Sequence, residues 1–219
     1  MPAEVRRFAD ADELGATLAT EILGARPSLL GCPGGRSLRS TYRRLPPLPE
    51  TTIVMMDEYV PVPPPSAHWS CRGFAERELP PARDVWLPDP DDPERYDERI
   101  AEAGGVDLCL LASGASDGHV AMLGPGAPRD GRTAVVELAE TTRRDNLRTF
   151  PDFDSLDDVP THGVSVGLAT IADARALRMV IHGDDKRGAI ERLLSYDTFD
   201  PAWPASIVHD HDDAEILIA

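Results

Sequence analysis

The sequence contains almost no lysine and almost no side-chain amide. One of its 22 basic residues is a lysine, Lys186, and its 219 residues include one asparagine, Asn146, and no glutamine. One explanation is functional. Lysine and arginine differ in geometry and hydration, so a chain that has arginine at nearly every other cationic position keeps one lysine where an ammonium group is needed. A coding bias toward arginine explains the same pattern, and composition alone leaves both explanations open.

Cysteine and long apolar runs are also scarce. The three cysteines have neither Cys-x-x-Cys nor paired Cys/His spacing, which argues against a structural zinc site and a disulfide framework. No apolar run approaches the length of a membrane span, and the first residues do not resemble a signal peptide. We therefore expect a cytoplasmic protein with no membrane partner, and the sequence indicates neither a metal nor another cofactor.

Positive charge is in short supply as well. The formal net charge is -16, which argues against nucleic acid as a partner because the phosphate backbone repels an acidic protein. A small phosphorylated molecule stays possible, since a few local cations can bind one phosphate. The hydrophobic fraction of 42% and the charged fraction of 27% are typical of a globular protein. The length suits one sizeable core, so we expect residues 1–219 to form one domain.

Strand-like and helix-like segments alternate along the chain with short connections. This alternation predicts an α/β fold with a single doubly wound, mostly parallel sheet flanked by helices, similar to a Rossmann fold. The expected helices are residues 11–24, 38–45, 68–79, 93–104, 141–150 and 187–194. The expected strands are residues 28–32, 51–56, 84–87, 106–111, 132–138, 164–167, 177–181 and 214–219. The proline-rich segment 61–65 predicts a loop.

The most informative stretch follows the apolar strand at 106–111. It places Asp117, Gly118 and His119 just past the carboxyl end of that strand. Open α/β sheets bind ligands at this edge, and a carboxylate beside an imidazole suits acid/base chemistry. An ordinary Asp-Gly turn is the alternative interpretation.

Two other strand ends carry candidate site residues. The strand at 28–32 leads into a glycine turn that contains Gly34, Gly35, Arg36 and Ser37. Exposed backbone N–H groups, a hydroxyl and a following helix are suited to bind a phosphate, although a plain strand-to-helix turn has the same pattern. The strand at 51–56 leads into Asp57 and Glu58, which are either acid/base groups or part of a solvated turn.

Six motifs stand along the chain in this order: Met56-Asp57-Glu58-Tyr59-Val60, Asp117-Gly118-His119, Thr142-Arg143-x-x-Asn146-x-Arg148-x-Phe150, Val159-Pro160, Val164-x-Val166-Gly167-x-x-Thr170-Ile171-x-Asp173-Ala174 and Trp203-Pro204-Ala205-Ser206. Together they resemble the glucosamine-6-phosphate deaminase family, which shares a superfamily with 6-phosphogluconolactonase. The resemblance covers nearly the whole chain.

The resemblance implies a role for each candidate residue. The phosphate of a sugar phosphate would be bound by Gly35 and Ser37 of the glycine turn, by Arg148 and by Lys186, and we expect Gly34 and Arg36 of the same turn to contact it as well. Asp57 would carry a proton between C2 and C1 of the opened sugar. Asp117 and His119 would assist ring opening, with His119 moving a proton at the ring oxygen. Glu58 and Gly118 would be further substrate contacts.

The chain departs from the family at several positions. Gly124 stands where the deaminases have the glutamate that partners the histidine, and Arg36 stands where relatives usually have a small hydroxyl residue. The loop after His119 instead resembles the lactonases, because it shares Ala121, Leu123 and Pro125 with them. Elsewhere the deaminase pattern returns, since Tyr59 and His162-Gly163 stand where lactonases usually have arginine.

We therefore expect a sugar-phosphate aldose-ketose isomerase or deaminase that acts on a hexose or amino-sugar 6-phosphate. One alternative is hydrolysis of 6-phosphogluconolactone, and another is a non-catalytic regulator that binds a sugar phosphate. The sequence ends without the C-terminal extension of the deaminases, which favours a monomer or a small homo-oligomer. Whether the substrate has an amine or a hydroxyl at C2 is left open by the sequence.

Overall fold

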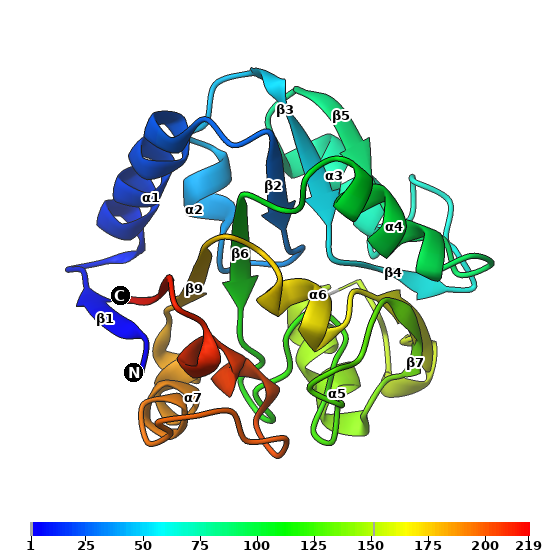
Figure 1. Ribbon diagram of the computed structural model, residues 1–219. Helices are drawn as coiled ribbons and strands as arrows, with labels where there is room; N and C mark the ends of the chain where they lie inside the picture. The colour runs from blue at the N-terminus through cyan, green and yellow to red at the C-terminus, as the bar shows by residue number, and fades with distance from the viewer. Residues whose placement is uncertain (1, 151) are drawn as a thin grey trace.

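The structure, a computed structural model, describes residues 2–150 and 152–219. A seven-stranded sheet in which all neighbouring strands are parallel lies at its centre (Figure 1). The strand order is β1-β10-β9-β6-β2-β3-β5. The bounds are β1 Glu4–Arg7, β2 Leu29–Cys32, β3 Leu48–Met55, β5 Ala82–Trp86, β6 Leu108–Ala112, β9 Leu177–Ile181 and β10 Ala214–Ile218.

Helices cover both faces of this sheet, because successive strand residues point to opposite sides. Leu30 faces one hydrophobic cluster, and its neighbour Leu29 faces the other. The first cluster is completed by α1 Ala11–Ala25, α2 Arg39–Tyr42 and α3 Cys71–Glu78. The second is completed by α4 Glu94–Glu102, α6 Leu168–Ala172, α7 Arg187–Leu193 and the short helix η3 Pro204–Asp210. The predicted α/β architecture is confirmed.

A second, antiparallel sheet was not expected from the sequence. It consists of β4 Asp57–Val60, β8 His162–Ser165 and β7 Ala134–Glu137, in the order β4-β8-β7. Asp57 and Glu58 therefore begin β4 and do not form the solvated turn that was the alternative interpretation, whereas the loop expected at residues 61–65 is confirmed. The strand patterns at 132–138 and 164–167 are confirmed as strands, but local alternation does not reveal which strand pairs with which.

Other predicted elements differ mainly in their ends. The helix expected at 38–45 is only the four residues of α2, and the helix expected from residue 68 begins at Cys71, where the Ser70 hydroxyl accepts a hydrogen bond from the Gly73 backbone N–H. The edge strand β1 and the helix α6 were not expected. The β1 strand is held by Arg6, whose guanidinium pairs with Glu21 and with Glu215 of the neighbouring β10.

The strand order reverses between β2 and β6. From β2 the chain proceeds to β3 and β5 on one side, and from β6 it proceeds to β9 and β10 on the other. Connections that leave neighbouring strands in opposite directions open a crevice at the carboxyl ends of those strands, where doubly wound proteins bind ligands. The glycine turn follows β2, and the Asp117–His119 loop follows β6. Within the described residues, the helices are too short or too polar to cross a bilayer.

Candidate active site

A cavity lies at this crevice, where the ends of β2 and β6 meet β4, α5 Glu140–Thr149 and the start of α7. Its lining combines acid/base groups with backbone and cationic groups: Pro33, Gly34, Gly35, Arg36, Ser37, Asp57, Tyr59, Cys71, Ala112, Ser113, His119, Ala121, Met122, Asn146, Thr149, Phe150 and Lys186. The structure thus brings Asp57, His119, the glycine turn and Lys186, which are far apart in the sequence, to one cavity.

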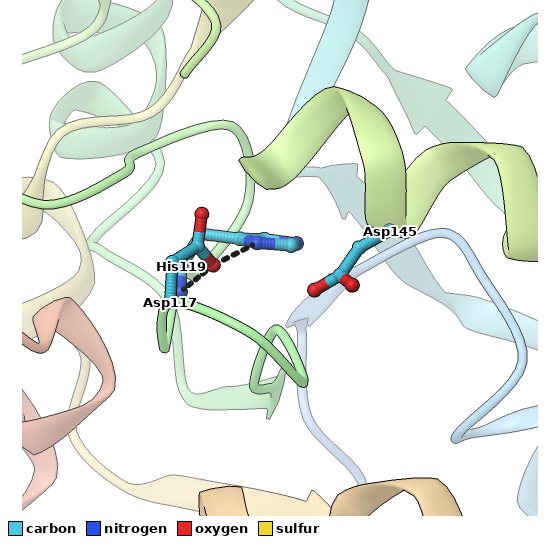
Figure 2. A group of neighbouring side chains, drawn as sticks. All are labelled: Asp117, His119 and Asp145. Atoms are coloured by element: carbon cyan, nitrogen blue, oxygen red, sulfur yellow. Dashed lines mark hydrogen bonds and ion pairs between the residues drawn. The ribbon is translucent and has the colours of Figure 1, made fainter. Parts of the chain in front are cut away.

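Asp117 and His119 form a hydrogen-bonded pair (Figure 2). The Nδ1 atom of His119 lies 2.7 Å from one carboxylate oxygen of Asp117, and the hydroxyls of Thr141 and Thr142 donate to the other oxygen at 2.6 and 2.8 Å. Burial opposes the charge of Asp117, but the hydrogen bonds from His119 and the threonines outweigh it and hold the pKa of Asp117 well below its usual range. Because Nδ1 faces this anion, Nε2 of His119 is the nitrogen that can exchange a proton with a bound molecule.

Asp145, on α5, approaches the His119 ring from another side than Asp117 (Figure 2). Asp117, His119 and Asp145 each offer a potential metal-ligand atom within 4.8 Å of the other two. Both Asp145 oxygens already accept hydrogen bonds from the loop after β6, at 2.8 Å from the Ala115 N–H and at 2.7 Å from the Ser116 hydroxyl. Asp145 therefore fastens this loop to α5, and its carboxylate lies near the hydrogen-bonded pair of Asp117 and His119.

Asp57 is a buried carboxylate with an unusual pKa. Burial raises its pKa to about 6, with Glu58 adding to the rise, while Cys71 and His119 act in the opposite direction. The Cys71 thiol donates a hydrogen bond to Oδ1 of Asp57 at 3.2 Å. Among the described residues no side chain donates to Oδ2, so that oxygen is available to a molecule in the cavity. A carboxylate with a pKa near neutrality and one available oxygen is suited to accept a proton.

Glu58 lies outside the cavity lining, although the sequence suggested a substrate contact. Its carboxylate accepts hydrogen bonds from the backbone N–H groups of Tyr59, Cys71 and Arg72 at 2.9 to 3.0 Å, and from the Ser70 hydroxyl at 3.3 Å. Glu58 thus ties the start of α3 to β4. This anchor positions Cys71 beside Asp57.

The lining of the cavity also includes the groups suited to a phosphate. Lys186 is partly buried there and donates to the backbone oxygen of Ser113. Burial lowers the pKa of Lys186, and nearby carboxylates, Asp145 first among them, oppose that shift. At the entrance, Arg36 donates to Asp185 at 3.1 Å. Gly34, Gly35 and Ser37 of the glycine turn line the same cavity as Lys186, and Gly35 has a positive φ of 96°.

Two further predicted site residues, like Glu58 and Asp117, do not line the cavity. Arg148 is exposed, because the face of α5 that carries Thr142, Asn146 and Thr149 points inward and Arg148 lies outside that face. Gly118 has a φ of +66°, and a Cβ atom there would lie 2.3 Å from the ring of Trp203. Gly118 therefore allows the loop to pack closely against Trp203.

Several lining residues were not assigned roles from the sequence. Asn146 donates to the Tyr59 hydroxyl at 2.7 Å, which joins α5 to β4 across the cavity wall. Both residues belong to quoted motifs, so a signal for them was present. Thr142, which donates to Asp117, also belongs to a quoted motif, whereas no local pattern gave a signal for Cys71, Thr141 or Asp145.

Comparison with known proteins places this architecture in a family. The family model described as glucosamine-6-phosphate isomerases/6-phosphogluconolactonase matches residues 11–217. The chain belongs to this family. A glucosamine-6-phosphate deaminase of Bacillus pumilus is 32% identical, over 96% of this chain and 95% of that protein. The deaminase of Rhodococcus opacus is 34% identical, over 94% and 86%.

Solved structures agree with membership in the glucosamine-6-phosphate isomerase/6-phosphogluconolactonase family, which is a family of enzymes. A monomeric glucosamine-6-phosphate deaminase superposes with a TM-score of 0.86 at 27% identity, covering 98% of this chain and 96% of that one. The 6-phosphogluconolactonase of Thermotoga maritima superposes with a TM-score of 0.72 at 18% identity, covering 99% and 98%, and shows the shared fold. The resemblance inferred from the motifs is confirmed.

Proposed function

We propose that this protein transfers a proton between C2 and C1 of an amino-hexose or hexose 6-phosphate, as an aldose-ketose isomerase or deaminase. The observation that carries the proposal is Asp57, a buried carboxylate with a pKa of about 6 that lines the same cavity as His119. Removal of a proton next to a carbonyl requires such a base, and its pKa matches the working pH of a general base. The likeness to the deaminases of Bacillus pumilus and Rhodococcus opacus supports the same chemistry.

In this proposal His119 acts on the sugar ring. Asp117, which stays ionised, fixes the His119 tautomer and stabilises the imidazolium that forms when Nε2 accepts the proton of the C1 hydroxyl. Nε2 then donates to the ring oxygen as the ring opens, and Asp57 removes the C2 proton and returns it at C1. The two groups therefore act on different atoms of one substrate.

The phosphate is assigned to the part of the cavity that the glycine turn and Lys186 line. The backbone N–H groups of the glycine turn, the Ser37 hydroxyl and the Lys186 ammonium would surround it, and Arg36 would leave Asp185 to pair with the dianion. Arg148 is not needed in this arrangement, because it lies outside the cavity lining. We also propose a monomer or small homo-oligomer, supported by the monomeric deaminase with the same fold.

Lactone hydrolysis is the second candidate function, and the Asp117–His119 pair favours it. An imidazole that is oriented by a carboxylate can activate a water molecule for attack on the C1 carbonyl. Gly124 leaves this pair without a further carboxylate from the loop that follows, and a Cβ atom at Gly124 would meet Ala139 and Thr142. Lactone hydrolysis does not use Asp57, however, and burial of a carboxylate that has no function lowers the free energy of unfolding without any gain in activity.

The experiment is a parallel assay with two substrates and one binding measurement. We expect ammonia and fructose 6-phosphate from glucosamine 6-phosphate, or exchange of the C2 proton of a hexose 6-phosphate with solvent. Hydrolysis of 6-phosphogluconolactone without either of these would overturn the proposal in favour of the second function. Calorimetric binding of the sugar phosphates without any turnover would instead indicate a regulator.

A further inference from the structure

Cys71 is the one thiol among the cavity-lining residues, and the proposed chemistry does not use it. It is the first residue of α3, it is buried, and its Sγ lies 3.2 Å from Oδ1 of Asp57. The other two cysteines, Cys32 and Cys109, are buried in the two hydrophobic clusters.

The backbone around Cys71 is fixed by an independent set of hydrogen bonds. Glu58 accepts from the N–H groups of Cys71 and Arg72 at 3.0 Å, and these bonds hold the first turn of α3 against β4. Glu58 and Asp57 are neighbours on β4, so the same anchor sets the position of the donor and of its acceptor. The hydrogen bonds to Glu58 therefore direct the Cys71 thiol at one oxygen of Asp57.

We propose that Cys71 is a positioning residue: its thiol holds Oδ1 of Asp57 and thereby leaves Oδ2 directed toward the substrate. This proposal rests on the proposed role of Asp57 as the base that moves the C2 proton. The thiol stays protonated in this setting, because burial, with Asp57 and Glu58 beside it, raises the pKa of Cys71. Cys71 is thus a permanent donor, and it does not titrate in competition with Asp57.

The donor also favours the ionised form of Asp57. Burial and Glu58 favour the protonated carboxyl, whereas Cys71 of α3 and His119 of the loop after β6 favour the carboxylate. The other titratable groups that sense Asp57 are phenols whose pKa values are raised by burial, so they stay neutral: Tyr42, Tyr59 and Tyr96. Removal of the thiol therefore leaves His119 as the main group that stabilises the charge of Asp57.

The test uses Cys71→Val, which keeps the volume but lacks the donor, and Cys71→Ser, which restores a donor. Infrared titration of the substrate-free protein follows the carboxyl band of Asp57, identified by its absence in Asp57→Asn. We expect the midpoint to rise by about one pH unit in Cys71→Val, the size of one hydrogen bond to a charged group, and to return toward the wild-type value in Cys71→Ser. The acid limb of kcat/KM is expected to move with the infrared midpoint. If Cys71→Val does not fold, Cys71→Ala provides the same comparison.

Cys109→Ala is the matched control, since Cys109 is a buried cysteine whose Sγ contacts Met56 and not Asp57. It is expected to lower stability and to leave the infrared midpoint unchanged. An unchanged midpoint in Cys71→Val overturns the role of Cys71, even if Asp57→Asn is inactive and the proposed function stands. A midpoint that moves while Asp57→Asn still exchanges the C2 proton supports the contact but overturns Asp57 as the base.

Discussion

Replacement of Asp57 by asparagine tests whether burial sets the chemistry of the site. Asparagine has nearly the same shape and keeps an acceptor for the Cys71 thiol, but it does not ionise. The pKa of Asp57 rises from 3.8 to about 6 on folding, and this shift corresponds to about 3 kcal/mol of unfolding free energy. The unfolded chain releases the Asp57 proton at lower pH than the folded one, so the wild type loses this stability between about pH 4 and pH 6. Above about pH 6 the wild type has lost the whole of this contribution to its unfolding free energy.

We therefore expect Asp57→Asn to be more stable than the wild type by about 3 kcal/mol at pH 8 and about equally stable at pH 4, measured by urea unfolding. The same variant is expected to lose exchange of the C2 proton while it retains binding of the sugar phosphate. Such a gain in stability with a loss of activity is typical of a residue that folding disfavours and catalysis needs. No gain at pH 8, or an equal gain at both pH values, would refute the argument from burial.

Asp117→Asn is the matched comparison, because the pKa of Asp117 is shifted in the opposite direction. A lowered pKa gives stability that is present above the unfolded value of about 3.9 and is lost as the pH falls toward the folded value. Asp117→Asn is thus expected to be destabilised at pH 8 by about 1 to 3 kcal/mol, through lost hydrogen bonds to a charged group. Its activity is expected to fall about 100-fold or more, because the amide no longer fixes the His119 tautomer. Equal stability effects in both variants would contradict the assigned environments.

Further predictions concern the cation, the glycine and the carboxylate that frame the site. Lys186→Ala is expected to weaken binding of a sugar phosphate by about tenfold or more, with little effect on the unphosphorylated sugar, in calorimetric titrations. Equal losses for both ligands would remove Lys186 from the phosphate site. Gly118→Ala is expected to lower stability by about 3 kcal/mol or more in thermal unfolding, because its Cβ meets the Trp203 ring at 2.3 Å and its φ is positive. Glu58→Ala is expected to lower stability by about 2 to 4 kcal/mol, since it leaves the buried donors at the start of α3 unpaired. A neutral effect would mean that water replaces this carboxylate.

Part of the candidate site was predicted from the sequence. Asp57, His119 and the glycine turn all lie directly after strands of a parallel sheet, and the carboxyl ends of such strands share one edge. Lys186 was singled out by composition, and the structure places it in the same cavity. Whether Glu58 and Arg148 contact a substrate was not decided by the motifs, because a motif gives the order of residues and not the direction of each side chain.

The sequence by itself determined most of the local elements and the α/β architecture, because hydrophobic periodicity, glycine turns and proline breaks act within a few neighbouring residues. Only the tertiary structure decided which distant groups meet. The second sheet pairs β4 with β8 across about half the chain, and the Thr142 hydroxyl reaches Asp117 across 25 residues. These contacts depend on how complete elements pack, and no local pattern encodes them. The resulting burial gives two aspartates of one site opposite pKa shifts, a difference that the residue type alone does not contain.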